Sequence, residues 1–237
     1  IKHLLAEVEV VCPVRPNQIW GPKYNMAMGD GGYVVREYGI DPWLKGSNAI
    51  CGPNESVMIE NDLFSRLGVT ASLVAVIGKQ CKKINAKNVS KYILGYTCGI
   101  DVASKRVSKE GVTTWKAKSA DNFSPVGPCI ETDFNADKFS VTMNINGNVV
   151  QTFKGSDLPY SPQEMVSYIS HQATLQPGDL VFVGGPEPHA RVLYEDVISC
   201  TIDGIGVLTN SMVEEYTSKK NGSMESSQQL FQGKLVI

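Results

Sequence analysis

The sequence predicts a β-rich α+β fold, with a mixed or antiparallel sheet and short helices. Segments with the pattern of strands outnumber those with the pattern of helices along the 237 residues. Several strand segments alternate apolar and polar residues, which is typical of a sheet that buries one face. Two of these segments are joined by Asn-Gly at residues 146–147, a dipeptide that strongly favours a tight hairpin.

The N-terminal third contains two predicted strands separated by a long irregular stretch. Residues 7–14, EVEVVCPV, alternate in polarity and are interpreted as a strand. Residues 22–52 are rich in Gly, Pro and Asn, which indicates loops with short elements, a common location for binding residues. Residues 69–77, VTASLVAVI, are mostly β-branched and apolar and predict a strand that ends at Gly78.

Helix and strand signals alternate through the rest of the chain. Residues 85–96 carry apolar side chains at helical spacing and predict a helix. A second helix is predicted from Ser161, where a capping box begins, to about His171. Residues 175–185 predict a turn followed by a buried strand, and residues 195–210 predict a long strand pattern with a glycine break.

Composition narrows the classes of partner. The chain is 42% hydrophobic and 19% charged with a formal net charge of −2, so no basic field favours nucleic acid or a membrane surface. No apolar run has the length of a membrane span and no targeting signal is visible, which predicts a cytoplasmic protein with a small-molecule partner. The six cysteines include no C-x-x-C pair, which indicates reduced, buried thiols rather than a zinc cluster.

Five segments resemble the fumarylacetoacetate hydrolase superfamily, in the family's order and with compatible spacing. They are LVAVIGK at 73–79, GYTCGIDVASK at 95–105, AKSADNFSPVGP at 117–128, TLQPGDLVFVGGP at 174–186 and DVISCTIDGIGVLTN at 196–210. The resemblance covers about residues 13–213. It implies a mixed β-roll that usually forms a homodimer and acts on β-diketo, enol or 2-oxo acid substrates.

The resemblance also suggests how the chain is divided. Residues 1–68 are expected to form an N-terminal arm and a small irregular region that contributes to the pocket. Residues 69–213 are expected to form the catalytic β-roll, and residues 214–237 a polar C-terminal tail.

The family's metal site departs from its usual pattern here. The family places Glu-x-Glu on the strand before V-I-G-K and an Asp in the next block. Asp101 matches that Asp, but the two Glu positions fall on Thr70 and Ser72. Divalent cations such as Mg²⁺ bind several oxygen ligands, usually including carboxylates, and one carboxylate with two hydroxyls supplies little charge. We therefore expect a divergent member with no metal ligands and no cofactor, Mg²⁺ being disfavoured.

Other family positions have also changed. Tyr24 is retained, but Ala27 occupies the position of the family's water-activating His, and Asp30 falls near its Glu partner. The family's G-T-P turn, whose Thr often contacts a substrate carboxylate, reads G-G-P here. The candidate substrate-binding residues are Tyr24, Asp30, Thr70, Ser72, Gly184, Gly185 and Arg191.

Three residues are candidates for catalysis. Lys118 is retained, and the family's Lys often faces the substrate's oxygen atoms; the alternative is an ordinary surface lysine. Asp101 could be a general base, with a pKa raised by desolvation once its cation is lost, or a structural carboxylate. His189, with Arg191 nearby, could bind or protonate an enolate at the pocket rim; the alternative is an exposed loop histidine.

Three functions remain open. The first is a metal-independent isomerase or cyclase, including Diels-Alderase-like pericyclic chemistry, acting on an enone, polyene or β-dicarbonyl natural-product-like substrate. In that case Lys118, Tyr24 and His189 would donate hydrogen bonds and Asp101 would accept a proton. The second is a Mg²⁺-dependent C–C hydrolase or decarboxylase with a degenerate metal site. The third is a non-catalytic binding subunit on the same fold.

Overall fold

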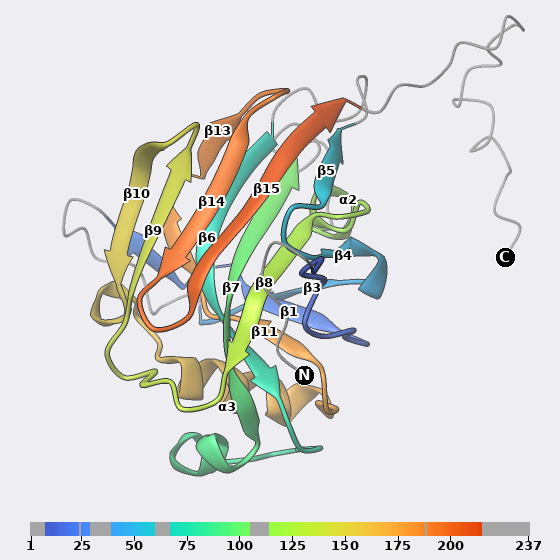
Figure 1. Cartoon of the computed structure of the whole chain (residues 1–237). Helices are drawn as coiled ribbons and strands as arrows, with labels where there is room; N and C mark the ends of the chain where they lie inside the picture. The colour runs from blue at the N-terminus through green and yellow to red at the C-terminus, as the bar shows by residue number, and fades with distance from the viewer. Residues whose placement is uncertain are drawn as a thin grey trace, which may run out of the picture.

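Strands dominate the architecture. The computed structural model of the chain describes residues 8–23, 25–28, 39–59, 67–104, 114–187 and 189–214. Within these residues, long curved strands form the body, α3 (Pro162–Gln172) lies at one end and α2 (Trp115–Lys118) lies at the side near β4 (Ile50–Cys51) and β5 (Ser56–Ile59) (Figure 1). The predicted mixed, β-rich fold with short helices is therefore confirmed.

Two large sheets and one small sheet account for the described strands. The first sheet has the order β3 (Pro42–Lys45), β1 (Ile19–Pro22), β11 (Leu180–Phe182), β6 (Leu67–Ile77), β7 (Ile93–Ser104), β8 (Ser124–Glu131) and β4 (Ile50–Cys51), and β13 (Ala190–Val192) also pairs with β6. The second has the order β10 (Asn148–Lys154), β9 (Ser140–Ile145), β14 (Val197–Ile202), β15 (Gly206–Glu214) and β5 (Ser56–Ile59). In the small sheet, β12 (Gly185–Glu187) pairs with β2 (Met26–Met28).

The helices are short. They are α2 (Trp115–Lys118), α3 (Pro162–Gln172) and the 3₁₀ turns η3 (Ser47–Ala49), η4 (Ala86–Lys91) and η5 (Gly155–Asp157). No helix in the described part of the chain is long and apolar enough to cross a membrane.

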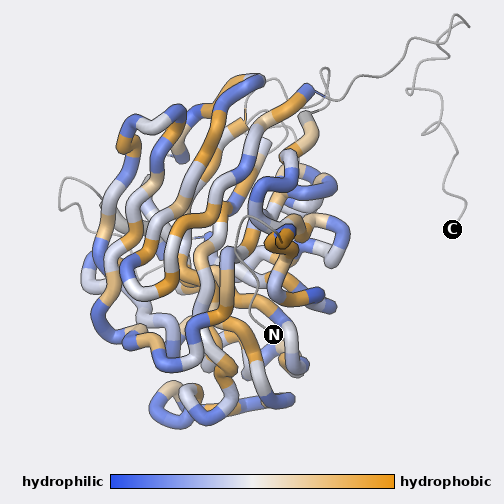
Figure 2. The backbone as a smooth tube through the Cα atoms, viewed as in Figure 1, coloured by the Kyte–Doolittle hydropathy of each residue, from blue (hydrophilic) through white to orange (hydrophobic). Residues whose placement is uncertain are grey.

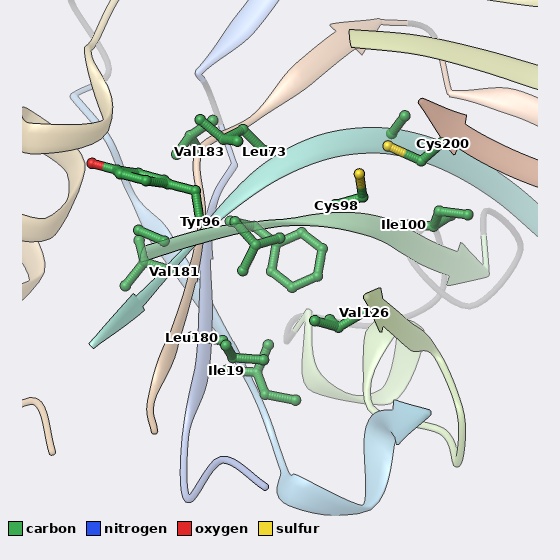
Figure 3. Packing of buried hydrophobic residues seen from close by; sticks show 14 of the residues in the cluster. Ile19, Leu73, Tyr96, Cys98, Ile100, Val126, Leu180, Val181, Val183 and Cys200 are labelled. Atoms are coloured by element: carbon green, nitrogen blue, oxygen red, sulfur yellow. The ribbon is translucent and has the colours of Figure 1, made fainter. Parts of the chain in front are cut away.

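Strand β6 is the central element of the fold. All of its residues are buried, and apolar residues recur along the strands of the molecule (Figure 2). Its long antiparallel pairing with β7 places side chains from both strands in one core with β1, β8, β11 and β14 (Figure 3). Each fully buried Leu, Ile or Val in this core contributes about 1.5–3 kcal/mol, so the β6–β7 register is strongly specified.

Three local predictions are confirmed. Asn146 and Gly147 adopt φ of 51° and 80° in the turn between β9 and β10. Helix α3 begins with the predicted capping box, in which the Ser161 hydroxyl accepts from the Glu164 N–H and the Glu164 carboxylate accepts from the Ser161 N–H. The glycine break falls in the turn between β14 and β15, where Gly204 has a φ of 86°.

Two local predictions are wrong. Residues 8–14, the described part of the predicted N-terminal strand, form no strand; the backbone at Cys12 instead packs against Gly52. The predicted helix at 85–96 is a 3₁₀ turn followed by β7, because pairing of Ile93 with Ile77 of β6 overrides the local spacing.

The predicted division of the chain into residues 1–68, 69–213 and 214–237 stays a prediction. Strands from both sides of the predicted boundary at residue 69 pair in the same sheets, and residues 215–237 lie outside the described part. All six cysteines are free thiols, and four are buried: Cys51, Cys81, Cys98 and Cys200. Two of these four, Cys98 and Cys200, lie close together in the core (Figure 3).

Candidate active site

The pairing of β6 with β7 sets the centre of a cavity. Thr70 lies directly opposite Asp101 in the register, and both side chains line a cavity of about 200 Å³. The aromatic rings of Trp43 and Phe182 supply much of its apolar wall, and Lys118 lines it from the short helix α2. The cavity is therefore fixed mainly by strands of the first sheet rather than by loops.

Two lysine ammonium groups converge on the carboxylate of Asp101. Lys45 Nζ lies 2.8 Å from Asp101 Oδ1, and Lys118 Nζ contacts Oδ2. His189 Nε2 lies 3.8 Å from the same Oδ2. With both lysines charged, this cluster carries a net positive charge even before His189 is protonated.

Lys45 is held in a closed polar shell. Its side chain is completely buried, and its ammonium lies 3.2 Å from the carbonyl oxygen of Val102 and 2.6 Å from that of Phe123. With Asp101, these oxygens provide three acceptors for its three N–H groups. Burial lowers the pKa of Lys45 to about 8, although Asp101 opposes this shift.

Asp101 does not have the raised pKa expected for a carboxylate stripped of its cation. Burial alone would raise its pKa, but the charges of Lys118 and Lys45 and the nearby His189 lower it well below its usual value. Asp101 is therefore ionised at neutral pH and is a weak base. The prediction of a raised pKa is wrong because the charges of Lys118 and Lys45 together outweigh the effect of burial.

Lys118 is not a surface lysine. Only 12% of its side chain is exposed, and its Nζ lies 4.9 Å from the centre of the Trp43 ring. Lys45 Nζ lies 5.1 Å from the same ring. Both ammonium groups are thus close to an aromatic ring that favours cations, and Lys118 is the one that lines the cavity.

The two hydroxyl residues of β6 differ in their surroundings. Ser72 Oγ lies 2.8 Å from the carbonyl oxygen of Gly184 and accepts from the Gly184 N–H, so it joins β6 to the turn before β12. Thr70 Oγ1 is buried and has no hydrogen-bond partner. A Cβ at Gly185 would lie 2.4 Å from Thr70 Cγ2, so the Thr70 side chain needs a glycine there. Thr70 is therefore the hydroxyl available to a ligand.

Only some of the other predicted site residues line the cavity. His189 lines the cavity with 19% of its side chain exposed, whereas Arg191 on β13 is exposed and is not among the cavity-lining residues. Gly184 lines the cavity with a φ of 112°, and a Cβ there would lie 2.0 Å from the carbonyl oxygen of Asn25. Tyr24 and Asp30 lie outside the described residues.

Sequence reasoning missed Lys45. A signal was present, because Trp43 and Lys45 are two apart on a strand and therefore face the same side. A charged residue on the same face as a buried aromatic residue needs a partner.

The donor set does not fit the divalent cation that the fold suggests. The described residues contain no group of three or more His, Cys, Asp and Glu side chains with the geometry of a metal site. Both oxygens of Asp101 contact lysine ammonium groups, and Ser72 is bonded to the backbone. The positive charge of Lys118 would repel a divalent cation placed beside it.

The fold is a β-roll, and a buried charged cluster in a small cavity is typical of an active site. The family described as Fumarylacetoacetate (FAA) hydrolase C-terminal matches residues 38–213. A fumarylacetoacetate hydrolase domain-containing protein 2 homolog of Dictyostelium discoideum is 34% identical over 86% of this chain and 74% of its own length. The chain belongs to the fumarylacetoacetate hydrolase family.

Two further relatives are named for isomerisation. The crystal structure of 5-carboxymethyl-2-hydroxymuconate delta-isomerase from Mycobacterium smegmatis is 31% identical and superimposes with a TM-score of 0.84, covering 90% of this chain and 84% of its own. The mitochondrial oxaloacetate tautomerase Fahd2a of Rattus norvegicus is 28% identical over 71% of this chain and 57% of its own length. Isomerases are therefore among the relatives of this chain.

Proposed function

We propose that this protein is an isomerase that moves a proton within a small, anionic, enolisable carbonyl compound without a divalent cation. The observation that carries the proposal is the convergence of Lys45 and Lys118 on Asp101 beside the cavity. A keto–enol isomerisation passes through an enolate, and catalysis requires a fixed positive charge near the developing oxyanion. Lys118 is placed to supply that charge.

The charge of the cluster selects the substrate. Two ammonium groups share one carboxylate, so an anionic group entering the cavity meets excess positive charge. The poorly hydrated surroundings strengthen this attraction relative to water. Thr70 adds a buried hydroxyl with no protein partner, which a substrate carboxylate or carbonyl would bind.

The proton carrier in this proposal is His189 rather than Asp101. The lowered pKa of Asp101 makes it a poor base, and its carboxylate orients the two lysines and His189. A histidine titrates near neutral pH, so it can accept a proton from one carbon and return it to another. The predicted role of Asp101 as the general base is therefore not carried forward.

The size of the cavity favours a small substrate. Pockets for drug-sized ligands measure about 300–1,000 Å³, and this cavity is about 200 Å³. Such a volume suits a short oxo acid better than a polyene of natural-product size. Cyclisation and pericyclic chemistry have no supporting observation here.

The test is conversion of the enol form of oxaloacetate to its keto form, followed by the loss of enol absorbance with and without EDTA. We expect catalysis that EDTA leaves unchanged and that Lys118→Met lowers by about 100- to 1,000-fold. Lys116→Met is the matched control, because Lys116 is exposed on the same helix. A panel of small 2-oxo acids, read by exchange of α-hydrogen for deuterium, extends the test to other substrates.

Two results would overturn the proposal. Loss of activity in EDTA with recovery in Mg²⁺ would return the protein to metal-dependent chemistry. Absence of turnover and of α-hydrogen exchange across the whole panel would favour the non-catalytic alternative.

A further inference from the structure

Resting on the function proposed above, we infer that Lys118 is a nucleophile that forms a covalent iminium with a ketone or 2-oxo acid substrate. Isomerisation would then proceed through an enamine on Lys118 rather than through a free enolate. The inference comes from the arrangement of two lysines around one carboxylate at the wall of a cavity.

The two lysines have different surroundings. Lys45 is sealed from the cavity, with three oxygen acceptors around its ammonium, and this shell holds it as a fixed cation. Lys118 shares Asp101 with Lys45 and lines the cavity. An amine that lines the cavity can reach the carbonyl carbon of a bound substrate, whereas an amine enclosed by backbone carbonyls cannot. The structure therefore points to Lys118 as the reactive lysine.

A histidine lies beside the carboxylate that this amine contacts. His189 Nε2 is 3.8 Å from Asp101 Oδ2, the oxygen that Lys118 also contacts. The side chains of both Lys118 and His189 line the cavity. A proton released by Lys118 can therefore be held by His189 while the amine reacts.

The surroundings of Lys118 suit an iminium. Its Nζ lies 4.9 Å from the centre of the Trp43 ring, which stabilises a cation on nitrogen. Ala117 and Phe182 contribute further apolar surface to the cavity. A largely enclosed, apolar site limits premature hydrolysis of the covalent intermediate.

The proposed step is balanced in protons and electrons. Lys118 gives one proton to His189, and its nitrogen lone pair attacks the carbonyl carbon as the carbonyl π pair moves to oxygen. A proton shifts from nitrogen to this oxygen, His189 returns its proton there, and the nitrogen lone pair expels water to give the iminium. Loss of an α-proton to His189 gives the enamine. Reprotonation at another carbon of a conjugated substrate gives an isomer, reprotonation at the same carbon gives only hydrogen exchange, and hydrolysis by water then releases the product and Lys118.

The experiment traps the intermediate in the full chain. The protein is incubated with pyruvate and sodium cyanoborohydride, digested and mapped by mass spectrometry. We expect one reduced pyruvyl adduct per chain, located on Lys118. Lys116→Arg should give the same adduct at Lys118, because Lys116 is exposed on the same helix and outside the cavity.

Lys118→Arg separates covalent from electrostatic catalysis, since arginine keeps the charge but forms no imine. We expect this variant to lose both the adduct and the exchange of α-hydrogen for deuterium in pyruvate, with its folding checked by circular dichroism. An unmodified Lys118 in an active wild-type protein would overturn the iminium while leaving the proposed isomerase intact. An unmodified Lys118 with no turnover would overturn both, and labelling spread over exposed lysines would overturn the iminium alone.

Discussion

Replacing Lys45 with Met tests whether the buried ammonium group stabilises the fold. Methionine keeps a long unbranched side chain but removes the charge and all three N–H donors. The substitution leaves the carbonyls of Val102 and Phe123 without this donor and removes one of the two lysines paired with Asp101. Breaking a buried ion pair from one side costs about 3–5 kcal/mol.

The lower end of that range applies, because Asp101 keeps Lys118 as a partner. We therefore expect Lys45→Met to lower the free energy of unfolding by about 3 kcal/mol, measured by reversible urea denaturation. In a chain of this size the melting temperature should fall by about 6–12 °C.

Lys23→Met is the matched control. Lys23 forms a 3.3 Å ion pair with Asp41, but the two side chains are 45% and 55% exposed. Such a pair contributes about 1 kcal/mol or less. If Lys45→Met were no more destabilising than this control, the ammonium would not be a structural cation, and our account of the cluster would be refuted.

Three further outcomes follow from the site and the fold. Thr70→Val removes a buried hydroxyl with no partner, so the free energy of unfolding should stay the same or rise by up to about 2 kcal/mol. The same variant should raise KM for an anionic substrate about fivefold in initial-rate assays. The pKa of Asp101 is lower in the folded chain than its unfolded value of about 3.9. Its ionised carboxylate therefore stabilises the fold above that value, and this stabilisation is lost as pH falls below it. Urea titrations from pH 6 to pH 3 should show the loss, and Asp101→Asn should reduce the dependence of the unfolding free energy on pH. Ser161→Ala removes the N-cap of α3 and should cost about 1 kcal/mol in the same assay, with unchanged turnover; a change below about 0.3 kcal/mol would contradict this role for the cap.

Local signals predicted those features that neighbouring residues determine. The Asn146-Gly147 hairpin and the Ser161 capping box depend on residues within a few positions of each other, and both appear as expected. The strand at residues 69–77 was also predicted, because an apolar, β-branched run at that length is strongly strand-like. Other elements depend on pairing between strands that are separated in sequence. The helix predicted at residues 85–96 is replaced for this reason, because Ile93 pairs with Ile77 of β6.

The difference between local and long-range determinants also explains which site residues could be predicted. Asp101, Lys118 and His189 were predicted as candidates, and the structure brings all three to one cavity. Lys45 was missed because its acceptors lie 57 and 78 residues away, on Val102 and Phe123. The pKa of Asp101 is lowered by the charges of Lys118 and Lys45, which converge on it only in the folded chain, so the direction of the shift could not be obtained from local sequence.

The pairing of Thr70 with Asp101 has a consequence for how new substrate preferences could arise on this scaffold. Those two positions are fixed by main-chain bonds between β6 and β7, at the centre of the molecule. The rim residues Thr114 and Pro186 line the cavity but lie outside β6 and β7, and they can change in sequence without shifting that register. A directed-evolution library confined to the rim would thus sample substrate shape while leaving the charged centre in place.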